Sequence, residues 1–294
     1  MEREADFLEF AHWHTVSGDI DPVYPVLARI GPKLTDTDDE LLSLILLYVA
    51  YYDLGSALWT WDDGWRPGKP LTDTQLRRPT GTERRGHRTL ARFSDHIAAL
   101  GMVHKRYGSW EYALWPADVI SPKSRWNVVQ ERLRNIRGNG RWAAYKTGEM
   151  LQTVAGWEMT PTDAGHDWST GPRQGLIDLF PELVGHDGHD PQTVRILDGY
   201  TRQLVEATGH PVEQVETHLC DWHSTLQGHY YLGHDIDLML AHLGHSPKHI
   251  QELVLGARAD SFDAMWLGEV NGWMGVRKEL NRLYKDKGTL AWWS

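Results

Sequence analysis

Apolar residues recur at helical spacing through most of the chain, and this pattern predicts a protein built mainly from α-helices. Thr37 and the acidic residues behind it form a typical helix start, and the apolar run that follows predicts one buried helix over Asp38–Trp61. Clean runs of alternating β-branched residues are absent, so we expect at most a minor sheet. Further helices are expected at about 83–100, 124–135, 142–154, 191–208, 211–226, 236–244, 246–255 and 273–284.

Turn-forming residues divide this helical pattern. Asp62–Pro70 contains two Pro and two Gly and predicts a loop. Glu158–Gly175 is longer, polar and rich in turn residues, which predicts a functional loop or a connection between lobes. We therefore expect a single helical domain over 1–294, with two helical lobes around a cleft and a lobe boundary near 156–175.

Composition excludes several classes of protein. The single cysteine, Cys220, excludes an internal disulfide and a cysteine-based zinc ribbon, and it fits a reducing compartment. The acidic start is unlike a secretion signal, and the longest apolar run is too short to cross a bilayer. We therefore expect a cytoplasmic protein with no membrane partner.

Histidine is abundant, with 16 residues in the chain, and ten of them lie between His186 and His249. No His-Glu-x-x-His motif occurs, and His245 and His249 flank Pro247 at an expected helix start. Solvated or hydrogen-bonded histidine is the simpler interpretation, so we predict no metal site. A divalent cation as a cofactor stays open, with no ligands assigned.

Charge is distributed very unevenly along the chain. The net charge is −10, yet residues 66–148 hold 17 Lys and Arg against 6 Asp and Glu. Four Trp, at 110, 115, 126 and 142, alternate with these cations. Cations that neutralise phosphates and rings that stack on bases together favour a DNA-facing segment. The alternative is a solvated basic face that pairs with the acidic remainder of the protein.

A glycine-rich turn lies at the end of this basic segment. Gly138 and Gly140 separate two short helices, and the second helix starts at once, with its first amides free to face an anion. This arrangement resembles the helix-hairpin-helix of DNA repair glycosylases, although an ordinary αα-turn with glycine caps is the alternative. The residues predicted to contact DNA are Arg137, Gly138, Gly140, Arg141, Trp142 and Lys146.

The order of four short motifs resembles the α-glutamyl/putrescinyl-thymine pyrophosphorylases of hypermodifying phages, also described as amino acid:DNA transferases. The motifs are Tyr48–Trp59, Gly138–Tyr145, Gly171–Leu176 and Leu219–Asp221, within roughly residues 40–245. The chain departs from the family pattern at three positions. Arg173 stands in place of Gly and Lys146 in place of Gln, and His223 stands in a region where a different polar or basic residue is expected. These departures leave the accepted amine and the activated base open.

The resemblance implies a glycosylase-like helical fold and an enzyme that hypermodifies thymine in DNA. An amine or amino acid would replace pyrophosphate on an activated 5-hydroxymethyluracil, after a DNA base kinase has acted. The implied partners are DNA carrying an activated pyrimidine and an amino acid or polyamine donor, in the cytoplasm of an infected bacterium. The base must also leave the DNA stack, and Trp142, Trp168 and Trp222 are candidates for stacking on it, with core packing as the simpler interpretation for Trp222.

Site residues follow from this chemistry. Arg173, flanked by glycines, is expected to grip the departing pyrophosphate, with a surface arginine as the alternative. Asp221 or His223 would accept the amine proton. Because residues two apart do not share a helix face, only one is expected to point at substrate, and Asp221 is preferred because it matches the motif of the family that the chain resembles. The predicted substrate-binding residues are Tyr52, Ser56, Trp168, Gly171 and Gly175.

Two other functions stay open. The first is a helix-hairpin-helix DNA glycosylase acting on a modified base, for which Lys146 would be the closest nucleophile and Asp163 or Asp167 the acid. The second is a non-catalytic DNA-binding or assembly protein.

Overall fold

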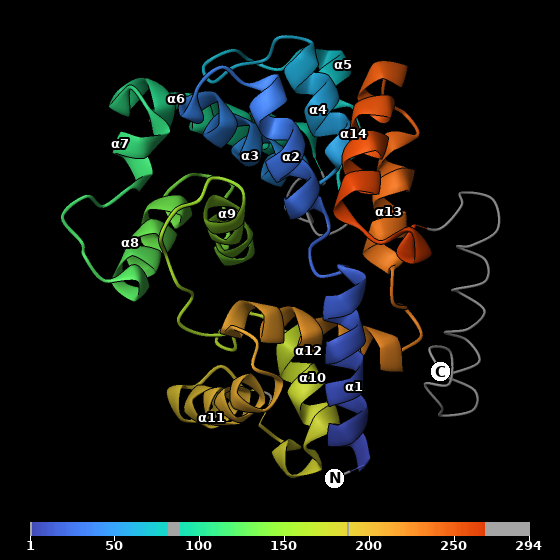
Figure 1. Cartoon of the computed structure of the whole chain (residues 1–294). Helices are drawn as coiled ribbons and strands as arrows, with labels where there is room; N and C mark the ends of the chain where they lie inside the picture. Colours follow the sequence, from blue (N-terminus) through green and yellow to red (C-terminus); the bar gives the residue numbers. More distant parts are fainter. Residues whose placement is uncertain (1, 82–88, 187, 268–294) are drawn as a thin grey trace. The chain divides into compact units, whose positions relative to one another are not determined.

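The computed structural model describes residues 2–81, 89–186 and 188–267, and within these ranges it is helical with no strand, which confirms the predicted α class (Figure 1). The helices are α1 (Glu2–Ser17), α2 (Val23–Leu34), α3 (Asp38–Tyr51), α4 (Leu54–Asp62), α5 (Asp73–Leu76), α6 (Leu90–Tyr107), α7 (Trp110–Leu114), α8 (Pro122–Arg134), α9 (Arg141–Thr153), α10 (Gly171–Leu179), α11 (Pro191–Thr208), α12 (Val212–Leu226), α13 (His234–Leu243) and α14 (Lys248–Ser261). Two short 3-10 helices are η2 (Pro181–Leu183) and η3 (Ala264–Trp266).

Contacts group the chain into two compact units, each assembled from separate stretches of sequence. Unit 1 contains the residues up to Pro22, Pro161–Leu238 and the described residues from Phe262 onward. Unit 2 contains Val23–Thr160 and Met239–Ser261. The chain passes between the units after Pro22, Thr160, Leu238 and Ser261. Two lobes around a cleft stay a prediction.

Unit 2 is built around α3, which packs against α2, α4, α6, α7 and α9. Its first turn begins as the sequence predicts, because the Thr37 side chain accepts a hydrogen bond from the Glu40 amide. Asp39 in the same turn accepts from the Trp110 amide at 2.7 Å and lies 2.6 Å from His104 Nε2. This one carboxylate therefore connects α3 with both α6 and α7.

The prediction of one continuous helix over Asp38–Trp61 is wrong. The chain leaves the helix at Tyr52, whose φ is +49°, and α4 starts again at Asp53, whose carboxylate accepts from the Ser56 amide at 2.8 Å. Both helices are buried, so the apolar pattern runs across the break without a change in period. The break was hidden because Tyr is an unusual residue in the left-handed region.

Unit 1 is built around α12, which packs against α1, α10 and α11 (Figure 1). Trp222 on α12 is fully buried, with its ring 5.9 Å from that of Phe7 and 5.6 Å from that of Phe10. Of the three tryptophans proposed for base stacking, Trp222 is therefore part of the core. Its burial fixes α12 against α1.

Helix α10 begins at Gly171, where the sequence indicated a loop up to Gly175. A Cβ atom at Gly171 would lie 2.5 Å from Cys220 Sγ, and one at Gly175 would lie 2.1 Å from the Leu219 carbonyl oxygen. Glycine is thus needed at both positions for α10 to approach α12. The expected approach of a ligand to these two glycines stays a prediction, since packing alone accounts for their spacing.

Several helix bounds agree closely with the sequence pattern, and α11 matches its predicted bounds of 191–208 at both ends. The helix expected at 83–100 is α6, which starts at Leu90 behind the side-chain cap of Thr89. The pattern did not identify α1, α2, α5 or α7. The helix expected at 273–284 lies outside the described residues.

Replacement of Gly175 by Ala tests the contact between α10 and α12. The Gly175→Ala variant should lower the free energy of unfolding by about 2–4 kcal/mol, because the new methyl group meets backbone rather than a movable side chain. Gly199→Ala on α11 is the matched control, since only the end of Arg202 comes within 4 Å of its Cβ. That variant should be neutral or more stable by up to about 1 kcal/mol. Equal effects in urea unfolding would contradict the packing role.

Candidate functional site

A short turn joins α8 and α9, as the glycine spacing predicts. Gly138 has φ +97°, and a Cβ there would also strike the His96 ring at 2.5 Å. Gly140 is the N-cap of α9, and its Cβ direction is open within 4 Å. Gly140 and Arg141 are both exposed at this helix N-terminus, where the helix dipole and the first backbone amides favour an anion.

Two arginines are exposed at this turn. Arg141 is exposed at the start of α9. Arg137 is also exposed and forms an ion pair with Asp95 on α6, with 2.7 Å between Nη2 and Oδ2. Such an exposed pair contributes little to stability, so Arg137 can exchange its partner for a phosphate at small cost.

Two residues with separately predicted roles lie together next to the turn. The Tyr52 ring packs edge-on against Trp142 at 4.6 Å and is tilted against Tyr48 at 5.3 Å. Both Tyr52 and Trp142 are half-buried, and the left-handed backbone at Tyr52 brings its ring to the start of α9. The break between α3 and α4 thus builds an aromatic surface at the candidate phosphate seat.

Lys146 does not line the turn as predicted. It lies in the second turn of α9, is buried, and pairs with Glu149 at 2.9 Å between Nζ and Oε2. The same carboxylate accepts a hydrogen bond from Tyr24 on α2 at 3.0 Å. A buried ammonium held in this way would have to break a desolvated ion pair to reach DNA or a sugar. This geometry disfavours both the DNA contact and the glycosylase nucleophile.

Ser56 is fully buried in the first turn of α4. Its Oγ lies 3.1 Å from His245 Nε2, and the same nitrogen lies 3.2 Å from Asp53 Oδ1. Ser56 and Asp53 both contact the same ring nitrogen of His245. The three side chains therefore cannot act as a serine–histidine–aspartate relay, which needs both ring nitrogens. Ser56 as a substrate contact stays a prediction.

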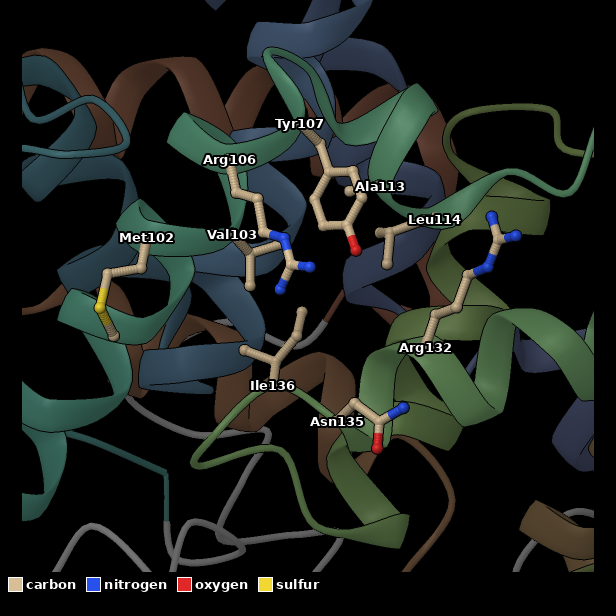
Figure 2. A pocket seen from close by; sticks show the side chains of 9 residues that line it. All are labelled: Met102, Val103, Arg106, Tyr107, Ala113, Leu114, Arg132, Asn135 and Ile136. Carbon is tan, nitrogen blue, oxygen red and sulfur yellow. The ribbon is translucent and has the colours of Figure 1, made fainter.

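A cavity of about 250 Å³ lies between α6, α7 and α8, beside the turn (Figure 2). Arg106 and Arg132 provide cations, the Tyr107 hydroxyl adds a hydrogen-bonding group, and no acidic residue is among the lining side chains. Arg132 Nη1 also donates to the Trp115 carbonyl oxygen at 3.0 Å. The lining therefore suits an anion with an apolar part. It consists of Met102, Val103, Arg106, Tyr107, Ala113, Leu114, Arg132, Asn135 and Ile136.

In unit 1, Arg173 is buried within α10 rather than exposed on a loop. Its Nη2 donates to the Ser169 carbonyl oxygen at 2.9 Å and lies 3.0 Å from His189 Nδ1. Trp168 is half-buried with its indole against Gly165, where a Cβ would lie 2.5 Å from the ring. An anion could therefore reach Arg173 only by displacing a present partner such as His189.

Asp221 and His223, which both lie on α12, contact side chains of different helices. Asp221 Oδ2 lies 3.6 Å from His14 Nε2 on α1, and its side chain is 15% exposed. His223 Nδ1 lies 2.6 Å from Asp178 Oδ2 on α10. This agrees with the expectation that the two do not share a face. The structure does not bring them together into one catalytic pair.

A buried polar cluster, which the sequence pattern did not identify, lies next to Asp221. Tyr230 donates to Asp19, its Oη lies 2.9 Å from His14 Nε2, and His14 Nδ1 lies 2.9 Å from His218 Nδ1. Burial lowers the pKa of His14 to about 4 and also lowers that of His218. Burial raises the pKa of Asp19 to about 7, with the nearby Asp235 adding to the effect.

Helical periodicity predicts that the two histidines of this cluster are buried. His14 continues the stripe of Phe7, Phe10 and Ala11 on α1. His218 lies likewise among Val215, Leu219 and Trp222 on α12. A histidine on an apolar stripe must be satisfied inside the protein, so the periodicity predicts that both are buried but does not identify their partners.

The described ranges contain neither a metal-binding cluster nor a membrane-spanning helix. No group of three or more His, Cys, Asp and Glu side chains there could hold a metal ion. None of the helices in those ranges has the length and apolar character needed to cross a membrane.

The chain matches the model of a known protein family. A family model described as amino acid:DNA transferase matches residues 36–231, about two thirds of the chain. The matched span contains the turn between α8 and α9, Arg173, and the part of α12 that carries His218 and Asp221.

Proposed function

The chain belongs to the amino acid:DNA transferase family, and we propose that it joins an amine to an activated 5-hydroxymethyluracil in DNA. The family match over residues 36–231 is the observation that carries this proposal. The donor is an amino acid or a related amine such as putrescine. The setting we infer is a phage-infected bacterium, where thymine is hypermodified.

The proposed reaction is a substitution at the methylene carbon attached to C5 of the base. The amine lone pair forms the new C–N bond, the C–O bond breaks, and pyrophosphate leaves with the bonding electrons. The amine nitrogen then loses a proton. Hydroxide is a poor leaving group, so the base must first be phosphorylated, which implies a DNA base kinase acting upstream.

We assign DNA backbone contact to the turn between α8 and α9. The α9 N-terminus supplies amides for one phosphate, and Arg137 and Arg141 add positive charge. The Tyr52–Trp142 pair offers an aromatic surface for a DNA base beside this phosphate. Helix-hairpin-helix binding of this kind positions DNA without reading its sequence.

We assign the chemical step to groups in unit 1. Asp221 is the proton acceptor, since its carboxylate is half-buried and lies beside His14. Arg173 offsets the charge of the departing pyrophosphate, with His189 as the partner that the anion displaces. Burial supports both roles, because charges interact more strongly away from water.

Mass spectrometry of nucleosides tests this reaction. Duplex DNA carrying pyrophosphorylated 5-hydroxymethyluracil, incubated with the protein and a pool of amino acids and putrescine, should yield an aminomethyl adduct and free pyrophosphate. DNA carrying unactivated 5-hydroxymethyluracil is the matched control and should give no adduct. Release of a free base with an abasic site would instead support a glycosylase. Unchanged DNA that the protein still binds would support a binding module.

The salt dependence of DNA affinity tests the phosphate seat. Arg141→Ala should weaken binding and reduce the slope of log K against log salt by about 1, because one fewer counterion is released. Arg29→Ala, an exposed arginine on α2 outside the basic segment, is the control and should leave the slope unchanged. Equal slopes for Arg141→Ala and the unmodified protein would contradict the assignment.

A further inference from the structure

Three histidines form a continuous row inside unit 1. His14 Nδ1 lies 2.9 Å from His218 Nδ1, and His218 Nε2 lies 2.9 Å from His210 Nδ1. His14 and His218 are fully buried, whereas His210 is half-buried and its Nε2 lies 3.5 Å from Thr15 Oγ1. The row therefore leads from the interior to the surface of the unit. Its inner end, His14 Nε2, meets Tyr230 and Asp221.

The hydrogen bonds in this row can all be satisfied by neutral rings. A neutral imidazole has one N–H donor and one bare nitrogen, so each contact needs a donor on one side only. Tyr230 donates to Asp19, which leaves its oxygen to accept from His14 Nε2. His218 then donates from Nδ1 to His14, and His210 donates from Nδ1 to His218. In this state all three protons lie on the inward-facing nitrogens.

The surroundings keep these rings neutral. Burial lowers the pKa of His14, His218 and His210, and the neighbouring histidines lower it further. The other titratable groups that face the row are Asp19, Asp221, Tyr230, Asp235 and His12. Asp235 and the backbone of Asp19 oppose the lowering of the His14 pKa, but desolvation is the larger effect. A row of neutral rings passes protons by exchanging them between neighbours.

We propose that His14, His218 and His210 conduct protons between Asp221 and solvent, a proposal that rests on the transferase function assigned above. Inward transfer begins when water protonates His210 Nε2. The Nδ1 proton of His210 moves to His218 Nε2, that of His218 moves to His14 Nδ1, and the Nε2 proton of His14 moves to Asp221. The 3.6 Å gap at Asp221 is the longest step and requires its carboxylate to approach His14.

Such a transfer reverses every hydrogen bond in the row, so a second proton must travel outward to restore it. The proposed substitution supplies this pair of events. Asp221 donates its proton to the departing pyrophosphate and then accepts one from the attacking amine. That proton returns to solvent through His14, His218 and His210. One turnover thus moves one proton in each direction and leaves the rings as they began.

His210→Ala tests the path because it removes the outer ring and leaves the two buried rings in place. Adduct formation in a single turnover should slow by about 10²-fold, and added imidazole should restore most of the rate. DNA affinity should not change. His229→Ala, an exposed histidine just before Tyr230, is the control and should keep the full rate with no response to imidazole. His210→Gln, of similar size, should be as slow as His210→Ala.

Nitrogen NMR of the imidazole rings tests the row without relying on activity. At pH 8, protons should lie on Nε2 of His14 and on Nδ1 of His218 and His210. A proton on His14 Nδ1 at that pH, or a folded His210→Ala variant with the full rate, would overturn the path. Absence of any adduct with the unmodified protein would overturn the transferase function instead, and the NMR result alone would then decide whether the row exists.

Discussion

Helix α12 approaches α10 so closely that only glycine fits at Gly171 and Gly175, and the arrangement of unit 1 depends on this contact. Trp222 fixes the opposite side of α12 against Phe7 and Phe10 of α1. The rotation of α12 about its axis is set by these two contacts. It follows that Asp221 faces α1 and its histidine, while α10 receives His223.

The distribution of charge along this chain says more about its partner than the net charge does. The net charge of −10 would disfavour a polyanion, but residues 66–148 are strongly basic. Burial then selects among the basic residues, because Lys146 is held by Glu149 inside the fold whereas Arg141 is exposed at the N-terminus of α9. A DNA surface here consists of a few exposed cations and backbone amides next to the Tyr52–Trp142 rings.

Periodicity and turn chemistry were sufficient to predict the α class, the bounds of α11 and the turn between α8 and α9. They could not predict the break at Tyr52, since a buried helix pair keeps one apolar pattern on both sides of a left-handed residue. The burial of Lys146 also escaped, because the carboxylate that holds it, Glu149, accepts from Tyr24, which is far away in sequence. Pairing of His14 with His218 depends on the packing of α1 against α12, which no local pattern specifies.

The central claim is that Asp221 handles the proton during transfer of an amine to DNA. It is tested most directly by the rate of adduct formation in a single turnover, with enzyme in excess over activated DNA. Asp221→Asn should slow this rate by about 10²–10⁴-fold without weakening DNA binding, whereas Glu206→Gln, an exposed carboxylate on α11, should not change it. A folded Asp221→Asn variant that forms the adduct at the unmodified rate would contradict the account.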